Sequence, residues 1–134
     1  MIEAGVVIGI DGQALHWHLP AGRSGGRLPD SRDLWDVLWD AHQRKQLRGF
    51  AHSHPGSGTP SPSQEDVSTF VAIESALGQS FDWWISSSDE TVWIRRAEMD
   101  SMPGREIYNV TKMPIEPPWV TELRRHSEIT DPYR

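Results

Sequence analysis

The feature that most constrains this chain is an apolar segment that delivers two histidines into a loop rich in proline, glycine and serine. The apolar segment covers residues 47–51, the histidines are His52 and His54, and the loop covers residues 55–62. Residues two apart on an extended backbone leave from the same face, so both imidazoles are expected on one face of a strand. Proline and glycine end regular structure immediately afterwards. The pattern predicts a buried strand that ends at a pair of imidazoles.

A helix is expected after the loop, and its first turn should direct a carboxylate toward the two histidines. Ser63 is typical of a helix N-cap, and Asp66 falls in the first turn, where side chains point back toward the helix start. Two imidazoles and one carboxylate are ligands that zinc accepts, and a catalytic zinc site leaves its fourth position to water. The chain has no cysteine, which excludes the closed structural sites built on thiolates. Glu65 is a rival ligand, but it points about 100° away from Asp66 on a helix, so only one of them can face the histidines.

A second histidine pair, His16 and His18, has the same spacing. No carboxylate follows it at a comparable offset, so a metal site is not expected there. We expect these two side chains on a partly exposed strand face.

One sequence pattern in this chain resembles the JAMM motif of the JAB/MPN+ metalloproteases. It consists of Glu3, the segment with the two histidines and the helix start at Ser63. That motif is a glutamate before an apolar strand, then His-Ser/Thr-His-Pro, then Ser-x-x-Asp. The loop before Ser63 is one residue longer than the commonest family spacing, and a loop with three prolines and two glycines can absorb that residue. The matching residues are Glu3 ahead of 4–9, His52-Ser53-His54-Pro55 and Ser63-Gln64-Glu65-Asp66.

The resemblance implies a role for each of these residues. His52, His54 and Asp66 are expected to hold one zinc ion per chain, and Asp66 is preferred to Glu65 because it keeps the family offset from Ser63. Glu3 is expected to activate water, and Ser63 to support the oxyanion. Other carboxylates remain as alternative general bases, namely Glu65, Glu74 and Asp11.

Composition limits the class of protein. A chain of 134 residues fits one domain with a real core. A net charge of -6 argues against nucleic-acid binding, which needs a basic face. No apolar run approaches the ~20 residues that span a bilayer, and no basic segment precedes an apolar core as in a signal peptide. A cytoplasmic protein is expected.

Strand and helix patterns alternate along the chain. Their order predicts an α/β fold in which a mixed β-sheet is flanked by helices. It is compatible with the α/β/α sandwich, related to cytidine deaminases, for which the JAB family is known. We expect a JAB/MPN-like catalytic domain over residues 1–110 and a C-terminal tail over 111–134, which either belongs to the same domain or docks a partner. The expected strands are 3–10, 13–19, 47–51, 81–86, 90–96 and 106–111, with a two-residue Asp11-Gly12 turn in the first hairpin. The expected helices are one that Asp30 or Ser31 caps and that runs to about residue 46, then 64–77 and 120–128.

The tryptophans are expected mainly in packing. Consecutive residues of a strand face opposite sides, so Trp83 and Trp84 must separate. At least one of them should line a core covered by helices, and the other could border a substrate groove. The remaining tryptophans expected to pack are Trp35, Trp39 and Trp93.

The resemblance implies a zinc-dependent peptidase or isopeptidase of the compact prokaryotic type, similar to deubiquitinases. Its expected substrate is a ubiquitin-like or sulfur-carrier protein with an extended C-terminal tail, and an E1-like activating enzyme is an expected operon partner. The alternative is a non-catalytic MPN-type scaffold in which the segment from residue 114 to residue 134 docks a partner. Zinc-dependent deamination is excluded because it requires cysteine ligands.

Overall fold

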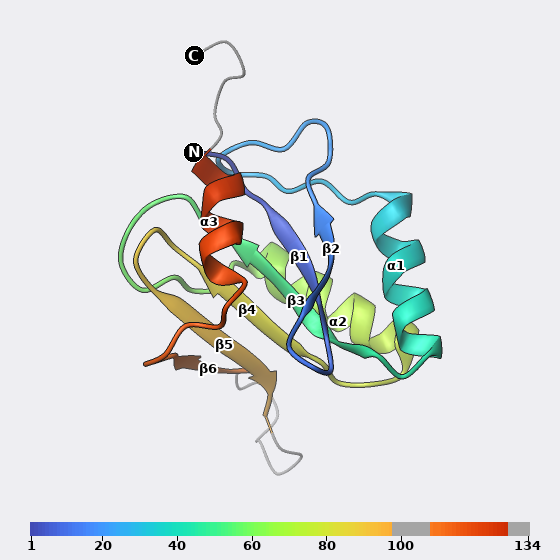
Figure 1. Ribbon diagram of the computed structural model, residues 1–134. Helices are drawn as coiled ribbons and strands as arrows, with labels where there is room; N and C mark the ends of the chain where they lie inside the picture. The colour runs from blue at the N-terminus through green and yellow to red at the C-terminus, as the bar shows by residue number, and fades with distance from the viewer. Residues whose placement is uncertain (98–107, 129–134) are drawn as a thin grey trace.

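The computed structural model describes residues 1–97 and 108–128, which form an α/β fold around one mixed sheet (Figure 1). The strand order is β2-β1-β3-β4-β5-β6, and only β3 and β4 pair in parallel among these strands. The expected fold class is confirmed. The strands are β1 (Gly5–Gly9), β2 (Ala14–His18), β3 (Leu47–Ser53), β4 (Asp82–Ser86), β5 (Thr91–Arg96) and β6 (Tyr108–Lys112), and the helices are α1 (Arg32–Gln43), α2 (Gln64–Leu77) and α3 (Val120–Glu128).

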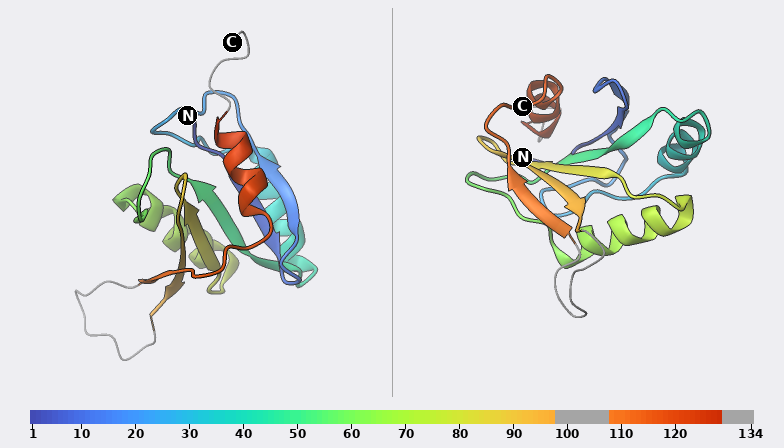
Figure 2. Two further views of the ribbon diagram at one scale, coloured as in Figure 1. Left: turned by 60° about the vertical axis from the view of Figure 1, so that its left-hand side comes forward. Right: turned by 90° about the horizontal axis from the view of Figure 1, so that it is seen from below.

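The helices cover both faces of the sheet, with α1 and α2 on one side and α3 on the other (Figure 2). Strand alternation sends neighbouring residues to opposite cores, so Val7 packs with α1 and α2 whereas Val6 packs with α3. Each core is apolar and closed. The sheet is therefore a rigid platform on which side chains at the strand ends are held in place.

Most expected element positions are confirmed. The α2 and α3 helices match their expected ranges, and α2 ends at Gly78 in the left-handed conformation. The first hairpin is present, but its turn is longer than the expected two residues, because the Gly9 N–H donates to the Gln13 carbonyl and leaves residues 10–12 between them. Residues 106 and 107 of the last expected strand lie outside the described residues, and β6 covers the rest.

The C-terminal part of the chain belongs to the same packed structure as far as it is described. Strand β6 pairs with β5, and α3 buries Val120 and Leu123 against the sheet. The apolar face of α3 is therefore already packed against the sheet. Residues 129–134 lie outside the described residues.

Two expectations about tryptophan are wrong. Trp84 does not border a groove, because it is buried beneath Trp119, with the ring centroids 5.5 Å apart. Trp39 does not pack in the core and is 56% exposed on α1. The helix pattern could not show which of its aromatic residues faces the sheet and which faces solvent.

In the described part of the chain, no helix is both long and apolar enough to cross a membrane.

Candidate metal centre

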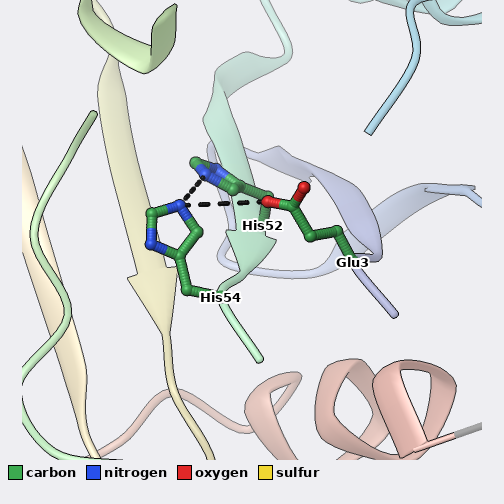
Figure 3. Close-up of side chains that lie close together, drawn as sticks. All are labelled: Glu3, His52 and His54. Carbon is green, nitrogen blue, oxygen red and sulfur yellow. Dashed lines mark hydrogen bonds and ion pairs between the residues drawn. The ribbon is translucent and has the colours of Figure 1, made fainter. Parts of the chain in front are cut away.

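The candidate site lies where the end of β3 meets the start of α2. His52 is the penultimate residue of β3, and His54 follows the strand directly. In the antiparallel β1–β3 pair, His52 lies opposite Gly5. The chain just before β1 therefore passes beside the histidines, which brings Glu3 to them (Figure 3).

The two imidazoles and Asp66 are in direct contact. The Nε2 atoms of His52 and His54 are 3.1 Å apart. One carboxylate oxygen of Asp66 lies 3.2 Å from His52 Nε2, and the other lies 3.1 Å from His54 Nε2. The sequence-predicted trio is thus brought together at a single point.

The start of α2 fixes the direction of the Asp66 side chain. Ser63 is the N-cap, its Oγ accepts the Asp66 N–H, and the Asp66 carboxylate accepts the Ser63 N–H, so the two residues form a capping box. Burial opposes ionisation of Asp66, but hydrogen bonds from His52 and His54 outweigh it and lower the pKa of this carboxyl. The same contact with Asp66 raises the pKa of His54. The Asp66 carboxylate therefore lies between the two imidazoles.

Glu3 is the second carboxylate at this point. It is buried, and its Oε1 lies 3.9 Å from His54 Nε2. Burial is the main cause that raises the pKa of Glu3, and the positive potential of the two histidines only partly opposes it. Ligand atoms of Glu3, His52 and His54 all lie within 4.8 Å of one another, so this group could hold a metal ion (Figure 3).

The centre opens into a cleft of about 560 Å³. The cleft is lined by the loop of residues 25–30, by the first turns of α2 and by Phe50. Ser63 is exposed and lines this cleft beside Asp66. The histidines, Glu3, Asp66 and Ser63 therefore all line the same cleft.

The rival carboxylates lie apart from the histidines. Glu65 lines the cleft but is exposed, and in the described part of the chain it forms no ion pair with either histidine. Glu74 is buried in a separate network with Arg96 and Tyr108. Asp11 is exposed in the first hairpin turn.

In the second histidine pair, His18 makes a structural contact that the sequence analysis did not predict. His16 is partly exposed as expected, but His18 is buried, which contradicts the expectation of a partly exposed face. Its Nε2 lies 2.7 Å from the carbonyl oxygen of Pro29, to which it donates. Since Pro29 lines the cleft, His18 fastens one cleft wall to β2. Only the fold reveals this contact, because nothing in the local sequence distinguishes His18 from His16.

Comparisons with known proteins assign no family. No family model matches the chain, and none of the curated proteins matches it. A functional assignment for this chain is therefore an inference from the residues and geometry of the site.

Proposed function

We propose that the chain is a zinc-dependent peptidase or isopeptidase of the JAMM type. The observation that carries the proposal is the convergence of His52, His54, Asp66 and Glu3 at the floor of one cleft. His52 lies in β3 and His54 follows it directly, whereas Asp66 lies in α2 and Glu3 precedes β1. Two carboxylates and two imidazoles from three segments are not expected to cluster on an ordinary solvated surface, whereas a hydrolytic metal site requires such a set.

The donor set fits zinc. Ligand bonds of about 2.0–2.2 Å place the donor atoms of a tetrahedron about 3.3–3.6 Å apart. The two imidazole nitrogens are 3.1 Å apart, and each lies near a different oxygen of the Asp66 carboxylate, at 3.2 Å for His52 and 3.1 Å for His54, all slightly shorter than these separations. Asp66 is therefore proposed as the third ligand. Glu3, whose Oε1 lies 3.9 Å from His54 Nε2, is proposed as the general base and not as a ligand.

When bound, zinc supplies Lewis acidity and lowers the pKa of a coordinated water to about 7. Glu3 accepts the proton of the attacking water and later delivers it to the leaving amine. Its burial favours this role, because a raised pKa brings a carboxyl group closer to the working pH of a base. The Ser63 oxygen accepts the Asp66 N–H, which leaves the hydroxyl proton to be donated to the oxyanion.

The lining of the cleft favours a peptide tail as the substrate. The cleft is lined by the loop of residues 25–30 and α2, and two exposed glycines, Gly25 and Gly26, lie in its wall. Such a passage admits a peptide tail without bulky side chains. We therefore propose that the scissile amide or isopeptide bond lies at the C-terminus of a ubiquitin-like or sulfur-carrier protein.

The test combines metal analysis with hydrolysis. The purified chain should contain about one zinc per molecule and should cleave a ubiquitin-like protein fused through its C-terminal glycine to a reporter. Glu3→Gln should keep zinc and lose cleavage, and Glu65→Gln is the matched control that should keep both. Iron in place of zinc would contradict the assignment, since two histidines and one carboxylate also form non-haem iron sites. An active Glu3→Gln protein would remove Glu3 from the mechanism.

A further inference from the structure

The backbone around Glu3 is held more completely than its place in the sheet requires. Strand β1 begins only at Gly5, so the β-ladder does not cover residue 3. Yet both peptide groups that flank the Glu3 Cα use their N–H and their C=O in hydrogen bonds. The Glu3 N–H donates to the Ser24 carbonyl at 2.8 Å, and the Glu3 carbonyl accepts from Arg23 Nη1 at 3.2 Å.

The other two bonds pass through a pair of serine hydroxyls. The Ala4 N–H donates to Ser53 Oγ at 2.9 Å, Ser53 Oγ donates to Ser127 Oγ at 2.9 Å, and Ser127 Oγ donates to the Ile2 carbonyl at 2.5 Å. Ser53 stands between the two histidines of the motif, and Ser127 lies in the last turn of α3. Both serines are buried, so water cannot readily replace these bonds.

Arg23 joins the same two regions from the other side. The Nη1 atom that binds the Glu3 carbonyl also donates to the His126 carbonyl at 3.2 Å. That carbonyl belongs to the last turn of α3, where helix carbonyls lack helical partners and attract cations. Arg23 therefore fastens the loop of residues 20–31 both to residue 3 and to the end of α3.

We infer that Arg23, Ser53 and Ser127 are positioning residues that hold Glu3 beside the imidazoles. This inference rests on the proposed role of Glu3 as general base. Residue 3 lies outside the β-ladder, which by itself would leave its backbone free to shift, and a displacement of about 1 Å can lower a rate 10²-fold. The hydrogen bonds described above remove that freedom, and two of the three side chains that make them lie outside the metal-binding motif.

The kinetic test compares variants of this clamp, defined as Arg23, Ser53 and Ser127, with matched controls. Ser127→Ala, Ser53→Ala and Arg23→Met should each lower kcat about 10- to 100-fold with KM and zinc content unchanged. Arg23→Lys keeps a cationic donor and should recover part of the loss. Ser53→Ala and Ser127→Ala should be non-additive in the double variant, because either one breaks the same relay.

The controls separate positioning from general packing. Arg124 also anchors α3, through the Ser87 carbonyl at 2.9 Å, but does not touch Glu3. Ser86 is a buried serine that bonds Thr91 instead. Arg124→Gln and Ser86→Ala should therefore keep kcat. Equal losses of kcat in Arg124→Gln and Ser127→Ala would overturn the inference.

A structural measurement keeps the test independent of hydrolysis. In the protein as purified, nuclear Overhauser contacts between the side chains of Glu3 and His54 should be present, should vanish in the clamp variants and should persist in the controls. Persistent contacts in Ser127→Ala and Arg23→Met would overturn the inference. An unmodified chain that cleaves no amide would overturn the proposed function, while the contacts would still decide whether the clamp holds Glu3.

Discussion

Gly49 and Asp82 lie so close across the β3–β4 pair that a β-carbon on residue 49 would sit 1.6 Å from the Asp82 carbonyl oxygen. This pair is the parallel one in the described sheet, and it aligns the strand that carries the histidines. Backbone cannot move aside as a flexible side chain can. The position therefore accepts only glycine without a shift of β3 relative to β4.

Gly49→Ala should destabilise the fold by about 3 kcal/mol or more, the upper range for overpacking. Urea denaturation followed by tryptophan fluorescence measures the change. The control is Gly26→Ala, where a β-carbon would meet nothing within 4 Å, and the change should stay within about 0.5 kcal/mol. Similar midpoints for Gly49→Ala and the unmodified chain would contradict the packing argument.

Asp66→Ala should lose the metal, whereas Glu65→Ala should keep it. Asp66 contacts both imidazoles, and its neighbour contacts neither. Elemental analysis of the purified variants measures bound zinc. Chelation should lower the Tm of the unmodified chain but not that of Asp66→Ala, because ligand binding to the folded state stabilises it. Retention of metal by Asp66→Ala together with its loss from Glu3→Gln would instead make Glu3 the third ligand.

Ser63→Ala should affect stability and catalysis separately. Ser63 and Ser31 cap α2 and α1 through the same contact, each accepting a backbone N–H at 3.1 Å. Loss of either cap should destabilise the fold by about 1 kcal/mol. Only Ser63→Ala should also lower kcat, by about 10²–10³-fold, because it removes the proposed oxyanion donor. Calorimetry and turnover measured on both variants would reveal a purely structural Ser63 if their kcat values agree.

His18 should make the fold sensitive to mild acid. Burial is the main cause that lowers the pKa of His18 below its usual range, and the bond to Pro29 only partly opposes it. Below about pH 6.5 the unfolded chain takes up a proton that the folded chain resists, so stability falls as the pH falls. The slope for this residue reaches at most about 1.4 kcal/mol per pH unit.

The free energy of unfolding, measured by urea denaturation between pH 7.5 and pH 5.5, should fall more steeply for the unmodified chain than for His18→Gln. All other titrating groups are shared by the two proteins, so the difference isolates residue 18. Parallel curves would show that His18 is protonated equally in both states.

Glu74 should matter for stability and not for catalysis. Its buried carboxylate accepts from the Phe81 N–H, Trp83 Nε1, Arg96 and Tyr108. Glu74→Ala leaves these donors unpaired and should cost about 3–5 kcal/mol, measured by urea denaturation. Cleavage by the folded fraction of Glu74→Gln should equal that of the unmodified chain. A loss of turnover in Glu74→Gln would return this residue to the list of general bases.

The same network holds the Tyr108 hydroxyl in its neutral form. Burial and the hydrogen bond to Glu74 raise the pKa of Tyr108. Removing the negative charge in Glu74→Gln should bring that pKa down toward its ordinary value, which ultraviolet titration of the tyrosines measures. An unchanged titration would mean that burial alone is responsible.

The local parts of this structure could be predicted from the sequence. Strand β3, the loop after it and the capping box of α2 depend on residues within about twenty positions of one another, and short-range rules describe such segments well. The same range brings His52, His54 and Asp66 together. Their contact follows from one strand end, one stiff loop and one helix start.

The rest depends on contacts between distant segments. Nothing near Glu3 indicates that Ser127 and Arg23 hold its backbone, because those bonds span 125 and 20 positions along the chain. Burial of His18 requires the loop that carries Pro29 to fold over β2. Burial of Trp84 requires Trp119 to cover it. Patterns of neighbouring residues carry no information about such pairings.

The relay from Ser127 to Ile2 also sets an order of events on the ribosome. Residues 52–66 leave the exit tunnel well before residue 127, and chains acquire structure from the N-terminal side during synthesis. Until residue 127 is synthesised, the Ile2 carbonyl therefore lacks the hydrogen bond that Ser127 donates to it. The set of hydrogen bonds that holds the backbone around residue 3 is therefore completed only when α3 packs against the sheet.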